Sequence, residues 1–491
     1  MVGSAAPEAA GGERRLLAAV GLTGSAALLT VVFGVATTKI IALTAGPAGI
    51  ALMGLYRYLG ALASRPLLLG LDTTLVQRIS TARDPKTSSE TVGAAFLAVF
   101  LQGILIAGIG LGLVELLARW LFGTSPTEAQ ILEIRVVLAM AYANLIMQIM
   151  NAALSGRVEF RKVAVVGTVA AAVTLVSVYP LLQLGNLGLA FNVGSGSTAG
   201  AALATFYVFR IYGASSLRAP LADRFRALSA ALARSAFLIV HPLVMMFAMV
   251  SVQSLILGQH ALPGLGAYNA AMTMLDTALL VIMSSARTFF LPELGQLEDE
   301  EDKVGVVNRV LRLSLILGSA ATLIAIAGGS FLIPFLFSDR FDRAIEILPP
   351  FSLALVGQSF VWTYAMFYLH KARYRLFFSL DLIWAVAYVG ATALVVSGGG
   401  SLTGAAWAYA ASYLLSGMVY TTVAVRAFGW RMLNGENLRL SAMALFGTLG
   451  ACLLHDLGLL LVDLVILGVG LGAAGWALRR SWVGARATEV A

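Results

Sequence analysis

The segment Gly46–Asp72 reads GPAGIALMGLYRYLGALASRPLLLGLD and carries three charged residues within a run long enough to cross a membrane. About 20 mostly apolar residues span a bilayer core as a helix. At 100° per residue, Arg57, Arg65 and Asp72 fall within roughly 80° of one another. A charge at the bilayer centre costs at least about 2.5–3.5 kcal/mol. We therefore expect this face to line a polar cavity, with an internal Arg65–Asp72 ion pair as the alternative. Pro66 is expected to kink or loosen the helix.

Stretches of similar length recur along the whole chain. The sequence is 59% hydrophobic and 12% charged, with a mean hydropathy of +0.87, whereas a soluble protein carries about 25% charged residues. Hydrocarbon forces such segments into helices, because every backbone N–H and C=O must be paired within the segment. We therefore predict an all-α polytopic membrane protein with about 14 transmembrane helices. The predicted spans are 16–44, 48–77, 91–121, 131–154, 163–184, 187–211, 228–257, 265–291, 308–337, 345–369, 376–397, 402–425, 439–455 and 458–478.

The distribution of basic residues orients these spans. Most of the 33 Lys and Arg residues lie at the ends that face the cytoplasm if the N-terminus is inside, and only Arg119, Arg340 and Arg343 lie at the opposite ends. This bias is the positive-inside rule. It predicts a multi-pass protein of the bacterial inner membrane with both termini in the cytoplasm. It also accounts for the net charge of +8 without a nucleic-acid partner.

The spans fall into two groups of six and a final pair. We predict an N-terminal six-helix bundle over 1–213, a cytoplasmic amphipathic linker helix over 214–234, a second six-helix bundle over 235–427, and an additional helix pair with a cytoplasmic tail over 428–491. Similar glycine- and proline-containing turns at Pro47 and Pro263 suggest that the bundles are parallel repeats. Transporters built from such repeats place substrate between the halves.

Other polar residues inside the spans are candidates for substrate binding or ion coupling. Lys39 lies about 8 Å from the outer end of its span, where a cavity role and snorkelling explain it equally. Asp276 shares a face with Asn269, which suggests ion coupling or buried hydrogen bonding, and Asp72 is a second coupling candidate. Asn144 and Gln148 lie one turn apart, as expected either for polar cavity lining or for hydrogen bonds between helices.

The residues needed for enzyme or metal chemistry do not group together. The chain has one cysteine, Cys452, and four scattered histidines, so we predict no metal site and no cofactor. It has no Walker-type phosphate loop. The short outer loops carry no cluster of acid, base and nucleophile, so we expect a protein that is not an enzyme.

The run Thr38-Lys39-Ile40-Ile41-Ala42, followed by Gly46-Pro47-Ala48-Gly49-Ile50-Ala51, resembles the start of Wzx-type polysaccharide flippases. These are lipid-linked oligosaccharide translocases of the MOP superfamily, which also contains MurJ and the MATE exporters. The resemblance implies alternating-access flipping of an undecaprenyl-diphosphate-linked oligosaccharide for cell-surface polysaccharide such as O-antigen. Arg57, Arg65 and Lys39 would neutralise the anionic group. Membrane lipid, a polysaccharide polymerase and other assembly proteins would be partners.

Three other functions remain in view. A small-solute or multidrug cation-coupled antiporter of the same superfamily would be expected to have acidic residues dominating its first bundle. A peptidoglycan lipid-precursor flippase would also carry an anionic lipid-linked substrate. A membrane glycosyltransferase or polymerase is disfavoured by the small outer loops.

Overall fold

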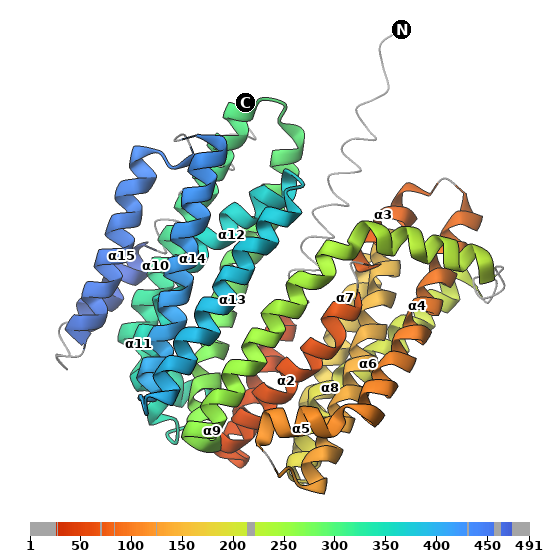
Figure 1. Cartoon of the computed structure of the whole chain (residues 1–491), viewed down its shortest axis with the longest axis horizontal. Helices are drawn as coiled ribbons and strands as arrows, with labels where there is room; N and C mark the ends of the chain where they lie inside the picture. The colour runs from red at the N-terminus through yellow and green to blue at the C-terminus, as the bar shows by residue number, and fades with distance from the viewer. Residues whose placement is uncertain are drawn as a thin grey trace. The chain divides into compact units, whose positions relative to one another are not determined.

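The computed structural model describes residues 26, 28–68, 71–82, 84–123, 125–213, 221–429, 432–455 and 463–473, and within these ranges it contains helices and no strand (Figure 1). The prediction of an all-α protein is confirmed. The chain divides into two compact units, residues 1–250 and 251–491.

The first unit is built from long antiparallel helices. After a helix over Leu28–Thr44, its elements are α2 (Gly46–Leu68), α3 (Leu71–Thr81), α4 (Pro85–Gly112), α5 (Val114–Phe122), α6 (Glu128–Gly156), α7 (Phe160–Leu182) and α8 (Asn186–Tyr212). Helix α9 (Leu221–Gln296) begins in this unit and ends in the second.

The second unit continues from α9 with a similar set of helices. Its further elements are α10 (Glu300–Leu336), α11 (Asp342–Ser352), α12 (Ala354–His370), α13 (Tyr374–Ser397), α14 (Leu402–Phe428) and α15 (Gly435–His455). A short apolar helix follows over Asp463–Ala473.

Several predicted spans are broken helices. The span predicted over 48–77 comprises α2 and α3. The span over 91–121 divides at Leu113 into α4 and α5. The span over 345–369 comprises α11 and α12, which meet at a 47° bend. That bend follows Pro349 and Pro350, which have no N–H to continue the hydrogen-bond ladder.

Helix α9 contains the spans predicted over 228–257 and 265–291, which meet at a break where Ala261 has a φ of 55°. The amphipathic linker predicted over 214–234 lies partly outside the described residues, and its part from Leu221 onward belongs to α9. By length and apolarity, the described residues contain eight membrane-spanning helices, or nine if α11 and α12 form one bent span. The fold is therefore that of a multi-pass membrane protein.

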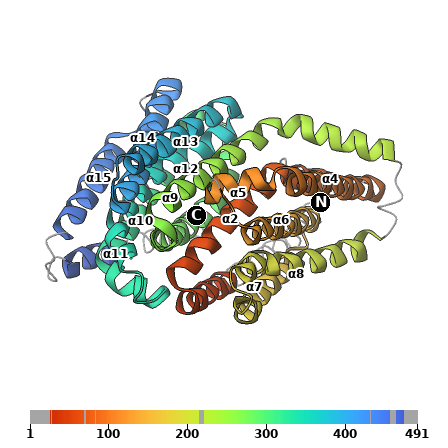
Figure 2. The ribbon, with the colours of Figure 1, turned by 60° about the horizontal axis from the view of Figure 1, so that its bottom comes forward.

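In the first unit, α6 packs against α2, α3, α4 and α8 (Figure 2). Small residues allow the close approach of α8. A Cβ atom at Gly194 would lie 2.1 Å from Cβ of Met140 on α6, and one at Gly196 would lie 2.2 Å from the carbonyl oxygen of Ala170 on α7. Close backbone packing of this kind holds helices together where lipid removes the hydrophobic driving force.

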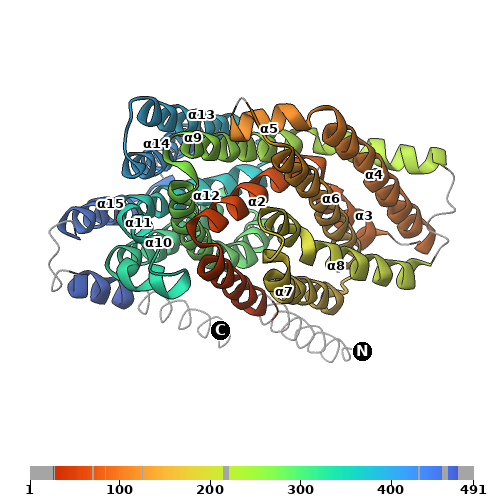
Figure 3. The same ribbon diagram turned by 90° about the horizontal axis from the view of Figure 1, so that it is seen from below.

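In the second unit, α14 packs against both α12 and α13, and α15 packs against α10 (Figure 3). A Cβ atom at Gly357 on α12 would lie 2.5 Å from the backbone carbon of Tyr413 on α14. On α15, the buried amide of Asn437 donates from Nδ2 to Oδ1 of Asn308 on α10 over 2.7 Å. The C-terminal helices are thus packed on the second unit through both small residues and a buried polar pair.

We predict that Gly357→Ala lowers the stability of the second unit by about 1–3 kcal/mol, because the added methyl group forces α12 and α14 apart. The measurement is thermal unfolding of the purified protein in detergent. Gly390→Ala on α13 is the matched control, since a Cβ atom there meets nothing within 4 Å. Equal melting temperatures for Gly357→Ala and Gly390→Ala would contradict the expected close packing.

Candidate substrate and coupling sites

Arg57 and Arg65 are both exposed on α2, whereas the adjacent Tyr56 is fully buried. Gly60 lies toward α6, where a Cβ atom would be 3.8 Å from Val137. The sequence of α2 therefore presents one packed side, rich in small and apolar residues, and one open side that carries the two guanidinium groups.

Neither arginine has a hydrogen bond or an ion pair among the described residues. The Arg65–Asp72 ion pair, which was the alternative explanation for the charged face, is absent. Asp72 lies on α3, whereas both arginines lie on α2, which ends at Leu68. That Asp72 shares a face with the arginines stays a prediction, because residues 69 and 70 lie outside the described residues.

The two arginines lie at different depths along α2. Arg57 lies about 16 Å along the helix axis from Gly46, close to half the thickness of a bilayer core of about 30 Å. Arg65 lies in the last turn of α2, where a cation is favoured by the helix dipole. Arg57 has no such compensation, so it is the stronger indicator of a polar or charged occupant.

Three further predicted residues lie on other helices of the first unit. Lys39 is half-buried in the helix over Leu28–Thr44. Asn144 and Gln148 on α6 are half-buried and make no hydrogen bond within the described ranges. Bonds between helices, the alternative for these two amides, are therefore not formed. Amide groups that the protein leaves unbonded remain able to bind a ligand or water.

A carboxyl–tyrosine pair in the first unit could not be identified from the sequence. Glu133 on α6 is only 4% exposed, and its Oε2 accepts a hydrogen bond from the hydroxyl group of Tyr56 on α2. Arg135, two residues further along α6, is exposed.

The second unit contains a corresponding buried pair. Asp381 on α13 is 4% exposed, and its Oδ1 accepts a hydrogen bond of 2.7 Å from the hydroxyl group of Tyr420 on α14. Packing of α12 and α14 against α13 excludes solvent from this carboxyl group.

Asp381 lies within a cluster of buried tyrosines, which we call the tyrosine cluster. Its members are Tyr268, Tyr364, Tyr368, Tyr388, Tyr409, Tyr413 and Tyr420. The Tyr364 and Tyr368 hydroxyl groups donate to the carbonyl oxygens of Met432 and Tyr420. These two rings therefore form neither a sugar-stacking surface nor an aromatic belt at the membrane interface.

Two residues predicted to act in coupling or cavity lining lie on α9. Asp276 is exposed, and it is close enough to Tyr413 to act on it electrostatically, as Asp381 does. Asn269 is buried and donates from Nδ2 to Oε1 of Gln253 over 3.5 Å. Of the two carboxyl groups near the tyrosine cluster, that of Asp276 is therefore exposed and that of Asp381 is buried.

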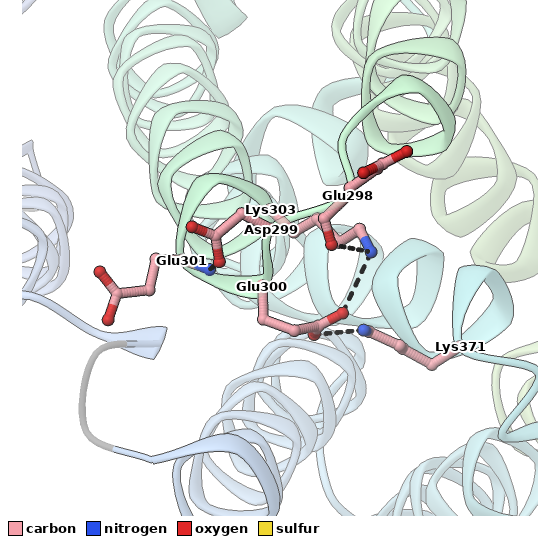
Figure 4. Close-up of polar contacts among 6 residues, drawn as sticks. All are labelled: Glu298, Asp299, Glu300, Glu301, Lys303 and Lys371. Carbon is pink, nitrogen blue, oxygen red and sulfur yellow. Dashed lines mark hydrogen bonds and ion pairs between the residues drawn. The ribbon is translucent and has the colours of Figure 1, made fainter.

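At the start of α10, an acidic run forms ion pairs within the second unit (Figure 4). The carboxylate of Glu300 contacts the ammonium groups of Lys303, at 3.0 Å, and of Lys371. These residues precede the apolar part of α10, and hydrogen bonds from Lys371 and Lys303 lower the pKa of the Glu300 carboxyl group. Glu300 therefore connects the start of α10 with the end of α12.

Solved structures with this fold are transporters. An inward-facing multidrug resistance MATE family transporter of the MOP superfamily aligns with a TM-score of 0.66 and 17% identity, over 84% of this chain and 95% of that chain. An outward-facing structure of a MATE family transporter aligns with a TM-score of 0.58 and 18% identity, over 86% and 94%. A MOP superfamily transporter from Pyrococcus furiosus, described as having a binding pocket of reverse polarity, aligns with a TM-score of 0.59 and 17% identity, over 87% and 95%.

No protein-family model and no curated protein matches the sequence. On the evidence of the structural alignments, the chain has the fold of the MATE transporters of the MOP superfamily.

Proposed function

We propose that this protein flips an anionic lipid-linked oligosaccharide across the membrane by alternating access. The observation that carries the proposal is the exposed face of α2, where Arg57 lies near mid-membrane without an ion pair in the described part of the chain. An uncompensated guanidinium group cannot face hydrocarbon without a large cost. A phosphate group that binds there would supply the missing countercharge through bidentate hydrogen bonds.

Other polar residues of the first unit suit the sugar part of such a substrate. The unbonded amides of Asn144 and Gln148 can donate to and accept from sugar hydroxyl groups. Lys39 and Arg65 add positive charge to the same unit. The lipid tail needs no protein pocket, because it can remain in the bilayer. Solved structures of this fold include both inward-facing and outward-facing states, which supports alternating access.

A multidrug antiporter is the second candidate, and the fold favours it, since the solved relatives include multidrug transporters. The cationic face of α2 argues for a substrate of opposite charge. A MOP transporter with a binding pocket of reverse polarity shows that the polarity of the pocket differs among proteins with this fold. Charge on the transported molecule is thus the property that separates the two candidates.

We further propose that Asp381, rather than Asp276, is the main coupling residue for a driving cation. A carboxyl group that binds and releases a proton or Na⁺ must be shielded from bulk solvent in one state, and Asp381 is buried whereas Asp276 is exposed. Tyr420 supplies a hydroxyl group at 2.7 Å that orients the carboxylate. Asp276 lies on the open side of the tyrosine cluster, where it can act as an entry point for the cation.

We predict that Arg57→Gln reduces flipping of a diphosphate-linked glycan by about 10-fold or more, because a charge-assisted hydrogen bond contributes about 1.5–3 kcal/mol. The measurement is accumulation of lipid-linked glycan in a deletion strain complemented by each variant. Arg57→Lys should retain part of the activity, and Arg135→Gln on the exposed surface of α6 is the matched control. Full complementation by Arg57→Gln would remove the basis of the proposal, and altered resistance to cationic toxins without glycan accumulation would favour the antiporter.

We predict that Asp381→Asn abolishes the dependence of transport on a cation gradient but leaves substrate binding unchanged. The asparagine keeps an acceptor for the Tyr420 hydroxyl group, so the fold should be preserved. The measurement is transport in proteoliposomes with and without imposed proton or sodium gradients, and Asp276→Asn tests the alternative residue. A loss of gradient dependence in Asp276→Asn alone would assign coupling to Asp276.

A further inference from the structure

A cavity of about 470 Å³ lies at the start of α10, beside the residues that lead into α15. Its walls are formed mainly by one face of α10, on which Glu301, Gly305 and Arg312 recur at helical spacing. The full lining is Glu301, Val304, Gly305, Asn308, Arg309, Arg312 and Asn434. This cavity belongs entirely to the second unit and is remote in sequence from the charged face of α2.

The walls of the cavity favour an anion. Arg309 and Arg312 supply two guanidinium groups to the lining, and Glu301 supplies one carboxylate. The carboxylate of Glu436, which is not part of the lining, pairs with Arg312. Arg312 forms one ion pair, from Nη2 to Glu436 at 2.7 Å, and its buried Nε has no hydrogen-bond partner in the described structure. Since guanidinium has five N–H donors, most of the donor capacity of Arg312 remains available for a ligand.

Helix α15 adds its positive end to the same place. The side chain of Asn434 accepts a hydrogen bond of 2.8 Å from the backbone N–H of Asn437, and its own backbone N–H approaches Oδ1 of Asn308 at 3.5 Å. These contacts hold the N-terminus of α15 against α10, at the edge of the cavity. A helix N-terminus favours a nearby anion, because the first N–H groups that the Asn434 side chain does not cap carry partial positive charge.

The outer surface of α15 shows which kind of anion fits. Leu438, Met443 and Phe446 are exposed along the helix that leads away from the cavity, and in a membrane they contact acyl chains. The positive-inside pattern assigns this end of the bundle to the cytoplasmic leaflet, where anionic lipids gather. A molecule with a phosphate head and apolar tails matches both surfaces.

We propose that this cavity binds a phosphate-bearing anion, the headgroup of an anionic phospholipid, and that the bound lipid holds the C-terminal helices on α10. The phosphate lies between Arg309 and Arg312, and the acyl chains lie along α15. The cavity is lined by residues of the second unit alone, and its proposed ligand does not depend on the proposed substrate.

Gly305 provides a direct test, because a Cβ atom there meets nothing within 4 Å. Gly305→Leu fills the cavity and replaces glycine with a stronger helix former, so the helix itself is not weakened. Gly390→Leu on α13 is the matched control, since a Cβ atom at Gly390 also meets nothing within 4 Å and α13 does not line the cavity. Arg309→Gln removes one charge at the cavity, and Arg426→Gln removes an exposed charge at the end of α14 in the same unit.

The experiment measures binding of fluorescent phosphatidylglycerol to the delipidated full-length protein in detergent, with phosphatidylcholine and inorganic phosphate as competitors. We expect binding by the wild type and both controls, a loss of about 10-fold in Arg309→Gln, and no saturable binding in Gly305→Leu. Phosphatidylcholine should compete weakly. Effective competition by inorganic phosphate at similar concentrations would assign the site to a free anion and overturn the lipid headgroup. Unchanged binding in Arg309→Gln and Gly305→Leu would overturn the site itself.

Discussion

The low polarity of the bilayer core is the constraint on which the rest of this structure depends. It requires each spanning segment to pair its own backbone groups, so the described chain is helical. It also makes every buried charge expensive, so each one needs a partner, a ligand or water. Glu133 and Asp381 meet this requirement through tyrosine hydroxyl groups. Arg57 does not meet it within the described structure, so an anionic ligand is the partner that its position calls for.

Apolar length and the positions of charged residues were sufficient to predict the fold class and most helix positions. The predicted span over 187–211 corresponds closely to α8 (Asn186–Tyr212), and that over 402–425 to α14 (Leu402–Phe428). Hydropathy predicted one span over 345–369, whereas the structure has α11 and α12, which meet at a 47° bend. An average over a window of residues carries no signal for such a change of helix direction.

The candidate sites were harder to predict, because burial depends on which helices pack together. Asp276 lies near the middle of a span and Asp381 near the end of one, so depth along the sequence favoured Asp276 for coupling. The structure reverses their exposure, since α12 and α14 pack around α13. The buried hydrogen bond of Glu133 could not be predicted, because its partner, Tyr56, lies on a helix that is distant in the sequence. Pairs of this kind carry no local signal.

The tyrosine cluster also gives the second unit a built-in optical probe. The Trp384 ring lies 5.2 Å from that of Tyr388 and 4.9 Å from that of Tyr413, and Trp384 is one helical turn from Asp381. Light absorbed by these tyrosines will pass efficiently to the indole by resonance energy transfer. The emission of Trp384 will be sensitive to any change in the charge of the Asp381 carboxylate. The proposed binding of a cation at Asp381 can therefore be followed by intrinsic fluorescence, without attaching a dye.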